Sequence, residues 1–258
     1  MDLKLRGRRA LVTAASRGLG RACAAALAGE GAQVFIVSRG LEGLAKTADE
    51  VGAVGRQALD LAEPPAPAAA IAAAVDTLGG LDIVVINAGG PPPGTFTSTS
   101  PEAWDVGYQL TLQSTVRLLR ASLPHLRDSK QARVVIVTST SVKEPIPNLV
   151  LSNAFRSAVT STAKTLATEL AATGITINCL APGRFATDRV HELDQANAER
   201  EGKTRQEIEA ASRAAIPAAR YGDPAEFGSV CAFLCSEQAG YLTGQTIVLD
   251  GGALRATI

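Results

Sequence analysis

Short, nearly continuous apolar runs alternate with longer helical patterns along the chain. Apolar runs rich in β-branched residues are typical of strands that are covered on both faces. Such runs predict strands at 9–15, 33–38, 55–60, 81–88, 132–139, 175–181 and 245–250. Helices are predicted between them, near 18–30, 41–50, 64–78, 101–127, 152–173 and 223–236. This alternation predicts an α/β fold, a doubly wound parallel sheet of seven strands with helices on both faces and right-handed crossovers.

One segment breaks this rhythm. Residues 184–222 are rich in charge and stand between a predicted strand and the next core helix. We interpret this segment as an inserted helical lid over a substrate pocket, within a single domain that spans residues 1–258.

Composition narrows the functional classes. Apolar residues make up 46% of the 258 positions, which is enough for a large core, and the net charge is zero. A balanced charge gives no support for a nucleic-acid partner. Neither a signal-peptide pattern nor a bilayer-length apolar run is visible, so we expect a cytoplasmic protein without a membrane partner. The four scattered cysteines are expected to be buried free thiols, with no metal site.

The first predicted strand runs into a glycine-rich turn. Gly18 and Gly20 stand where the next helix begins. Glycines in that place allow the backbone to approach a phosphate, which binds at the helix N-terminus. The position after the first strand favours a Rossmann-type dinucleotide loop over a glycine-rich turn without a ligand.

The end of the second strand indicates which dinucleotide. NAD-binding folds often place an acidic residue there to hold the ribose hydroxyls, whereas this chain has Ser38 and Arg39. Arg17, inside the glycine loop, could converge on the same point. Guanidinium groups suit a dianionic phosphate, so the pattern predicts NADP(H) rather than NAD(H). The alternative is that each arginine is a solvated surface charge.

Further motifs resemble the short-chain dehydrogenase/reductase family over essentially the whole length. Thr13 with the loop glycines resembles its TGxxxGxG motif, with Ala14 in place of the first glycine, and the tail "YLTGQTIVLDGG" resembles its last strand. Asp60 matches the residue that receives the adenine amino group, and the threonine of a PGxxxT segment, here Thr187, holds the nicotinamide amide. The resemblance is to bacterial 3-oxoacyl-acyl-carrier-protein reductase-like members in particular. The predicted cofactor-binding residues are Thr13, Ser16, Arg17, Gly18, Leu19, Gly20, Ser38, Arg39, Asp60, Leu61, Asn87, Ala88, Gly89, Arg156, Pro182, Gly183 and Thr187.

The resemblance also implies where the chemistry lies. The family uses an Asn–Ser–Tyr–Lys set, and its orienting serine falls on Ser139. The tyrosine, lysine and asparagine positions hold Ser152, Arg156 and Thr111 instead. These four residues are the predicted catalytic residues. A serine hydroxyl is a far weaker acid than a phenol and shorter by a whole ring, so acid catalysis should change. Arg156 keeps the positive charge and should still hold the nicotinamide ribose, but it stays protonated and cannot relay a proton.

Other interpretations of these positions stay open. Ser152 could be only a helix N-cap, since the helical pattern begins there. Ser139 could be a strand-end hydroxyl that bonds the backbone, and Arg156 a surface charge. Lys143 and Tyr108 are candidate substitute acids, although Tyr108 is more typical of a packing or interface residue. We expect His125 at a helix end and His191 in the lid.

The sequence therefore predicts an NADP(H)-dependent oxidoreductase with an atypical catalytic set. It would transfer hydride between the nicotinamide and a small-molecule carbonyl or alcohol substrate, and a 3-oxoacyl thioester is one candidate. The alternatives are a cofactor-binding sensor or partner subunit without turnover, and a non-redox enzyme on the same scaffold. The resemblance implies a homo-oligomer, a tetramer or dimer, that forms through the helices at 101–127 and 152–173.

Overall fold

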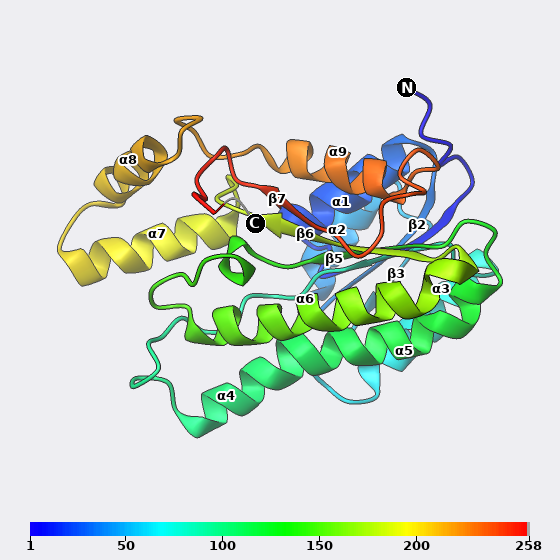
Figure 1. Cartoon of the computed structure of the whole chain (residues 1–258), viewed down its shortest axis with the longest axis horizontal. Helices are drawn as coiled ribbons and strands as arrows, with labels where there is room; N and C mark the ends of the chain where they lie inside the picture. Colours follow the sequence, from blue (N-terminus) through cyan, green and yellow to red (C-terminus); the bar gives the residue numbers. More distant parts are fainter. Residues whose placement is uncertain (257–258) are drawn as a thin grey trace.

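The computed structural model describes residues 1–256 and is built on one parallel sheet (Figure 1). Its strand order, β3-β2-β1-β4-β5-β6-β7, confirms the predicted doubly wound sheet of seven strands. The strand order reverses between β1 and β4, because β1 lies between β2 and β4. The strands are β1 (Arg9–Thr13), β2 (Gln33–Ser38), β3 (Gly55–Ala58), β4 (Ile83–Ile86), β5 (Arg133–Val137), β6 (Thr176–Pro182) and β7 (Thr246–Leu249).

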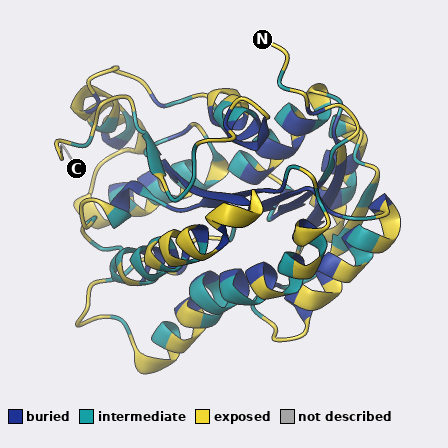
Figure 2. Ribbon diagram, turned by 45° about the vertical axis from the view of Figure 1, so that its right-hand side comes forward, coloured by how far each residue is buried: buried dark blue, intermediate teal, exposed yellow. Residues whose placement is uncertain are grey.

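Helices cover both faces of this sheet, and buried residues follow the strands and the inner sides of the helices (Figures 1 and 2). One core packs α1, α2 and α9 against the sheet, and the other packs α3, α5 and α6 against its opposite face. The core helices are α1 (Gly18–Gly29), α2 (Leu41–Val51), α3 (Ala66–Leu78), α4 (Pro101–Gly107), α5 (Ser114–Arg127), α6 (Val150–Leu170) and α9 (Pro224–Cys235).

A glycine lets two core helices approach each other closely. At the contact of α1 with α9, a Cβ added at Gly228 would lie 2.4 Å from the carbonyl oxygen of Ala22. The two backbones therefore approach more closely than any side chain at this position would allow. The cysteines share these cores: Cys23, Cys179, Cys231 and Cys235 are all buried and free, as predicted.

The predicted helix at 101–127 has three parts. A π-helical segment, Tyr108–Gln113, separates α4 from α5. Thr111 lies in this segment and is 2% exposed. Such π segments widen the helix by one residue per turn and often occur at functional sites.

Helix α6 begins earlier than predicted, at Val150, and this corrects one interpretation of Ser152. The N-cap position is Leu149, which makes no side-chain cap, and Ser152 lies inside the first turn. The side chain of Asn153 instead fixes the loop before the helix. Its Oδ1 accepts a hydrogen bond from the amide nitrogen of Ile146, and its Nδ2 donates to the carbonyl oxygen of Ile146. The interpretation of Ser152 as an N-cap is therefore wrong.

Segment 184–222 forms two further helices, α7 (Asp188–Glu201) and α8 (Arg205–Ala215). The buried carboxylate of Asp194 on α7 connects this helix to the chain before α7 and to the chain after α8. Asp194 accepts hydrogen bonds from Arg184 and, at 2.7 Å, from the Tyr221 hydroxyl. Within residues 1–256, none of the helices combines the length and the apolar character needed to cross a membrane.

Candidate functional site

A cleft of about 930 Å³ opens at the carboxyl ends of the strands, beside the reversal of strand order. Ligands bind at this place in doubly wound sheets. The structure brings most of the predicted site residues to its walls. Those that line it are Ser16, Arg17, Gly18, Leu19, Ser38, Arg39, Asp60, Leu61, Asn87, Ala88, Gly89, Ser139, Ser152, Arg156, Pro182, Gly183 and Thr187.

The glycine loop is shaped by residues behind its surface. A Cβ at Gly20 would lie 2.3 Å from the carbonyl oxygen of Ala14, so only glycine fits this turn. Thr13 is fully buried, and its hydroxyl bonds both the amide nitrogen and the carbonyl oxygen of Asn87. Neither Thr13 nor Gly20 lines the cleft, so both contribute to the shape of the loop rather than to the wall of the cleft.

Ala14 adopts the left-handed conformation, with φ of 48°. This is the position where the resemblance leads one to expect glycine. A non-glycine residue pays a steric cost in this conformation. The loop therefore keeps a glycine-like backbone despite the substitution.

The two arginines predicted at the ribose phosphate each face a carboxylate in this structure. Nη1 of Arg17 lies 3.0 Å from the Glu192 carboxylate and 3.5 Å from that of Asp188, both on α7. Arg39 lies 4.0 Å from Asp60, across the end of the second strand. Both arginines line the cleft and are more than half exposed, and each has a carboxylate within 4.0 Å.

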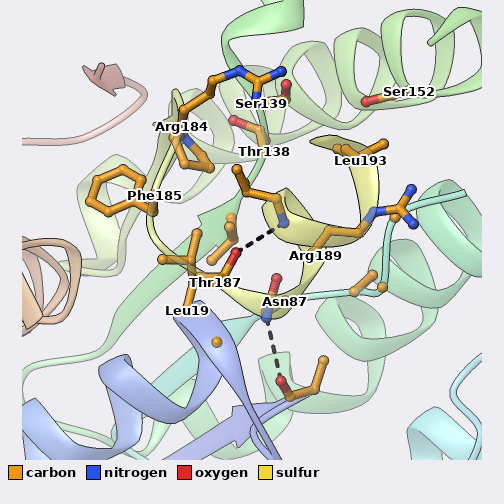
Figure 3. A pocket seen from close by; sticks show the side chains of 18 of the residues that line it. Leu19, Asn87, Thr138, Ser139, Ser152, Arg184, Phe185, Thr187, Arg189 and Leu193 are labelled. Atoms are coloured by element: carbon orange, nitrogen blue, oxygen red, sulfur yellow. Dashed lines mark hydrogen bonds between the residues drawn. The ribbon is translucent and has the colours of Figure 1, made fainter. Parts of the chain in front are cut away.

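Hydroxyl groups cluster at the other end of the cleft. Ser139 follows β5 and Ser152 lies on α6 beside it (Figure 3). The Ser152 hydroxyl lies 3.5 Å from that of Ser141, and the Ser139 hydroxyl accepts the amide hydrogen bond of Ser141 at 3.1 Å. Ser139 therefore bonds the backbone and faces the cleft at once. The cluster offers several weak hydrogen-bond donors and acceptors but no phenol.

Arg156 lies against this cluster and is not a surface charge. It is 8% exposed, and its Nη1 donates to the carbonyl oxygen of Val137 at 2.9 Å. Burial, together with the positive charge of Arg189, lowers the pKa of Arg156 to about 10. A guanidinium that deprotonates near this value remains charged at neutral pH.

Besides Thr13 and Gly20, five of the singled-out residues lie outside the cleft. Thr111 is buried in the π-helical segment, where its hydroxyl has no hydrogen-bond partner among residues 1–256. Tyr108 packs against Phe155 and accepts a hydrogen bond from Gln113, and Lys143 is exposed. Neither side chain lines the cleft, and the contact with Phe155 fits the interpretation of Tyr108 as a packing residue. His125 stands in the last turn of α5.

The remaining histidine, His191, lies on α7, and it does not line the cleft either. No group of three or more histidine, cysteine, aspartate or glutamate side chains that could hold a metal ion occurs in the described part of the chain.

Sequence reasoning missed several polar residues of the cleft. Thr138 is 2% exposed and lines the cleft, and its hydroxyl has no hydrogen-bond partner among residues 1–256. Arg184 and Arg189 reach the cleft from segment 184–222 (Figure 3). Arg189 donates to the carbonyl oxygen of Pro91 at 3.2 Å. The position of Arg189, two residues after the predicted site residue Thr187, was the one feature of the sequence that could have indicated a place in the cleft.

Comparison with known proteins identifies the family. A family model described as enoyl-(acyl carrier protein) reductase matches residues 13–253. The 3-oxoacyl-[acyl-carrier-protein] reductase FabG of Vibrio cholerae is 35% identical, over 97% of this chain and 98% of that protein. The chain belongs to the short-chain dehydrogenase/reductase family.

Solved structures agree with the fold. The L-sorbose reductase of Gluconobacter frateurii, in complex with NADPH and L-sorbose, has a TM-score of 0.94 and 29% identity, over 99% of this chain and 100% of its own. A variant of actinorhodin polyketide ketoreductase with NADPH has a TM-score of 0.92 and 30% identity, over 96% and 98% of the two chains. This protein is thus a short-chain oxidoreductase by family and by fold.

Proposed function

We propose that the protein is an NADP(H)-dependent oxidoreductase that transfers hydride between the nicotinamide and a small carbonyl or alcohol substrate. The observation that carries the proposal is one continuous cleft. It joins a glycine loop shaped for a phosphate to the hydroxyl cluster of Ser139 and Ser152. Both solved relatives described above are titled as complexes with NADPH.

The residues of the cleft fit this cofactor. Its phosphates would bind at Gly18 and Leu19, because the N-terminus of α1 offers free amide groups there. Arg17 and Arg39 would hold the 2′-phosphate, and Arg156 would donate to the hydroxyls of the nicotinamide ribose. When bound, NADP(H) supplies or accepts the hydride at its nicotinamide ring.

The hydroxyl cluster supports substrate binding and an unusual proton delivery. Reduction adds a hydride to the carbonyl carbon and a proton to its oxygen. Ser139 and Ser152 would donate hydrogen bonds to that oxygen and hold a water molecule that provides the proton. Arg156 would stabilise the negative charge that develops there, since a buried positive charge acts strongly in a site with little water.

Segment 184–222 and two exposed apolar residues suggest two further roles. We propose that α7 and α8 cover the substrate, since Leu193 and Ser212 line the cleft. We also propose a dimer or tetramer that forms through the helices at 101–127 and 152–173 and buries two exposed side chains, Val106 in α4 and Phe96 before it. Light scattering at micromolar concentration should give a multiple of the 26.6 kDa chain mass. A monomer would contradict the oligomer.

The decisive experiment measures turnover and binding side by side. NADPH oxidation is followed with a panel of oxoacyl thioesters, ketones and quinones, and NADPH binding is measured by calorimetry. Oxidation with at least one carbonyl compound is the expected result. Binding without oxidation of any of them would instead support a cofactor-binding sensor or partner subunit, which the replaced tyrosine and lysine favour.

A further inference from the structure

The buried charge of Arg156 is not paired with a carboxylate among residues 1–256. The side chain is 8% exposed, and its one hydrogen bond goes to a neutral acceptor, the carbonyl oxygen of Val137. No carboxylate among residues 1–256 lies within 4.0 Å of its guanidinium group. A buried charge is costly unless it is paired, so a guanidinium in this state requires an anion from outside the chain.

The acids that line the cleft are engaged elsewhere. Asp60 faces Arg39, and Asp188 and Glu192 face Arg17. Asp250 accepts amide hydrogen bonds from the chain that follows it. None of these four acids lies within 4.0 Å of the Arg156 guanidinium group.

A second arginine adds to the imbalance. Arg189 lies close enough to Arg156 that its charge contributes to the lowered pKa of Arg156. Its nearest carboxylate is that of Glu192 at 3.8 Å, and Glu192 lies closer to Arg17, at 3.0 Å. Arg184 differs, because Asp194 neutralises it. The positive charges of two guanidinium groups, those of Arg156 and Arg189, are therefore only weakly balanced by carboxylates at the substrate end of the cleft.

The proposed cofactor does not supply the missing charge. Its phosphates belong at the glycine loop, at Gly18, and ribose hydroxyls are neutral. At the substrate end, Ser152 is shorter by an aromatic ring than the tyrosine of the family. The space beside its hydroxyl can therefore admit a small group of the substrate next to Arg156.

We propose that Arg156 and Arg189 bind a carboxylate of the substrate, so that the protein acts on oxo acids and hydroxy acids rather than on neutral ketones or thioesters. This inference rests on the proposed function. In the reducing direction the carbonyl carbon gains a hydride and its oxygen gains a proton. The carboxylate is unchanged, and the product is a hydroxy acid.

The test compares each acid with its own methyl ester. Acetoacetate and pyruvate are assayed beside methyl acetoacetate and methyl pyruvate, and kcat/KM is expressed as an acid-to-ester ratio. The unaltered protein should prefer the acids. Arg156→Gln should lower the ratio by about 10- to 100-fold, which is what the loss of one charge-assisted contact is worth. Arg189→Gln should lower it less, because Arg189 is more exposed.

Two matched variants complete the set. Arg156→Lys keeps a positive charge and should keep the preference for acids. Arg127→Gln removes an exposed arginine at the far end of α5 and should leave the ratio unchanged. Weaker cofactor binding affects acid and ester alike, so it does not change the ratio. If Arg156→Gln does not fold, the Arg189→Gln and Arg156→Lys variants decide.

A binding measurement separates this inference from the proposed function. Acetoacetate is titrated by calorimetry into the protein saturated with NADP⁺. Binding that Arg156→Gln abolishes supports the carboxylate site even if no compound oxidises NADPH. Equal use of acid and ester by the unaltered protein overturns it. Loss of NADP⁺ affinity in Arg156→Gln at an unchanged ratio also overturns it, since Arg156 would then serve the cofactor alone.

Discussion

Arg17 reaches from the glycine loop to α7, where its Nη1 lies 3.0 Å from Oε1 of Glu192. The two side chains are about half exposed, and ion pairs of that kind contribute only about 0–1 kcal/mol. A dianionic phosphate offers Arg17 a stronger partner than one exposed carboxylate does. We therefore expect that a phosphate bound beside the glycine loop would compete with Glu192 for Arg17 and so weaken this contact with α7.

Cofactor preference is the first prediction. Because Arg39 and Arg17 flank the predicted phosphate position and no acid follows β2, NADPH should bind more tightly than NADH. Arg39→Asp should shift the preference towards NADH, since one charge-assisted contact is worth about 1.5–3 kcal/mol. Calorimetric titration with both cofactors measures this shift. Lys46→Asp makes the same charge change on the exposed side of α2 and should leave the preference unaltered. Equal binding of both cofactors by the unaltered protein would refute the role of the arginines.

The role of Ser152 can now be tested without the complication of a helix cap. Its hydroxyl makes one contact, with Ser141 at 3.5 Å, so Ser152→Ala should cost little stability and spare NADPH binding. If the hydroxyl helps to deliver a proton, turnover should fall by about 10²–10⁴-fold. Stopped-flow and steady-state NADPH oxidation measure this. Ser157→Ala, which removes an intrahelical hydroxyl bond one turn further along α6, is the matched control. Unchanged turnover in Ser152→Ala would exclude the hydroxyl from proton delivery.

The fold was predictable because its signals are local. The buried strands β1, β4 and β5 are short apolar runs, and each was predicted within two residues of its bounds. The start of α6 was not, because Val150 and Leu151 read as an extension of the preceding proline-containing loop. What fixes that start is the bond from Asn153 back to Ile146, which depends on how the loop folds.

The sequence predicted the parts of the site that short motifs define, but not the contacts between segments that are distant in the sequence. Glycine spacing indicated the phosphate loop, but the partner of Arg17 stands 175 residues away on α7. Burial of Arg156 without a carboxylate is also invisible in the sequence. It depends on β5, α6 and segment 184–222 meeting at one point, which only the tertiary structure shows.

The stability of the fold in acid should depend on Asp82, which directly precedes the central strand β4, at the end of the sheet away from the cleft. Burial alone would raise its pKa, but the hydrogen bonds from Arg9 and Ser129 outweigh that effect and hold the pKa well below 3.8. A depressed pKa stabilises the folded state above pH 3.8 and loses this contribution as the pH falls further.

Asp82→Asn should therefore lower the free energy of unfolding by about 1–3 kcal/mol at neutral pH. It should also lose less stability than the unaltered protein when the pH falls below 3.8. Urea unfolding at several pH values measures both effects. Asp76→Asn, at an exposed position of α3, is the control. Parallel pH profiles for Asp82→Asn and the unaltered protein would show that this carboxylate does not govern acid stability.

Restoring the family's pair, Ser152→Tyr with Arg156→Lys, tests how far the pocket has changed. A phenol titrates near pH ~10, and a neighbouring lysine lowers that value, so the pair restores a usable acid. The ring would extend from the first turn of α6 into the space that the serine leaves open, on the side of Ser139. Reduction of neutral carbonyl compounds should rise by about tenfold or more, because a positioned general acid contributes at least that much. NADPH oxidation with methyl acetoacetate measures the gain, and the two single variants show whether both changes are needed. If the double variant folds, binds NADPH and gains nothing on any neutral carbonyl, the pocket no longer places a carbonyl group beside residue 152, and its chemistry depends on the buried arginine instead.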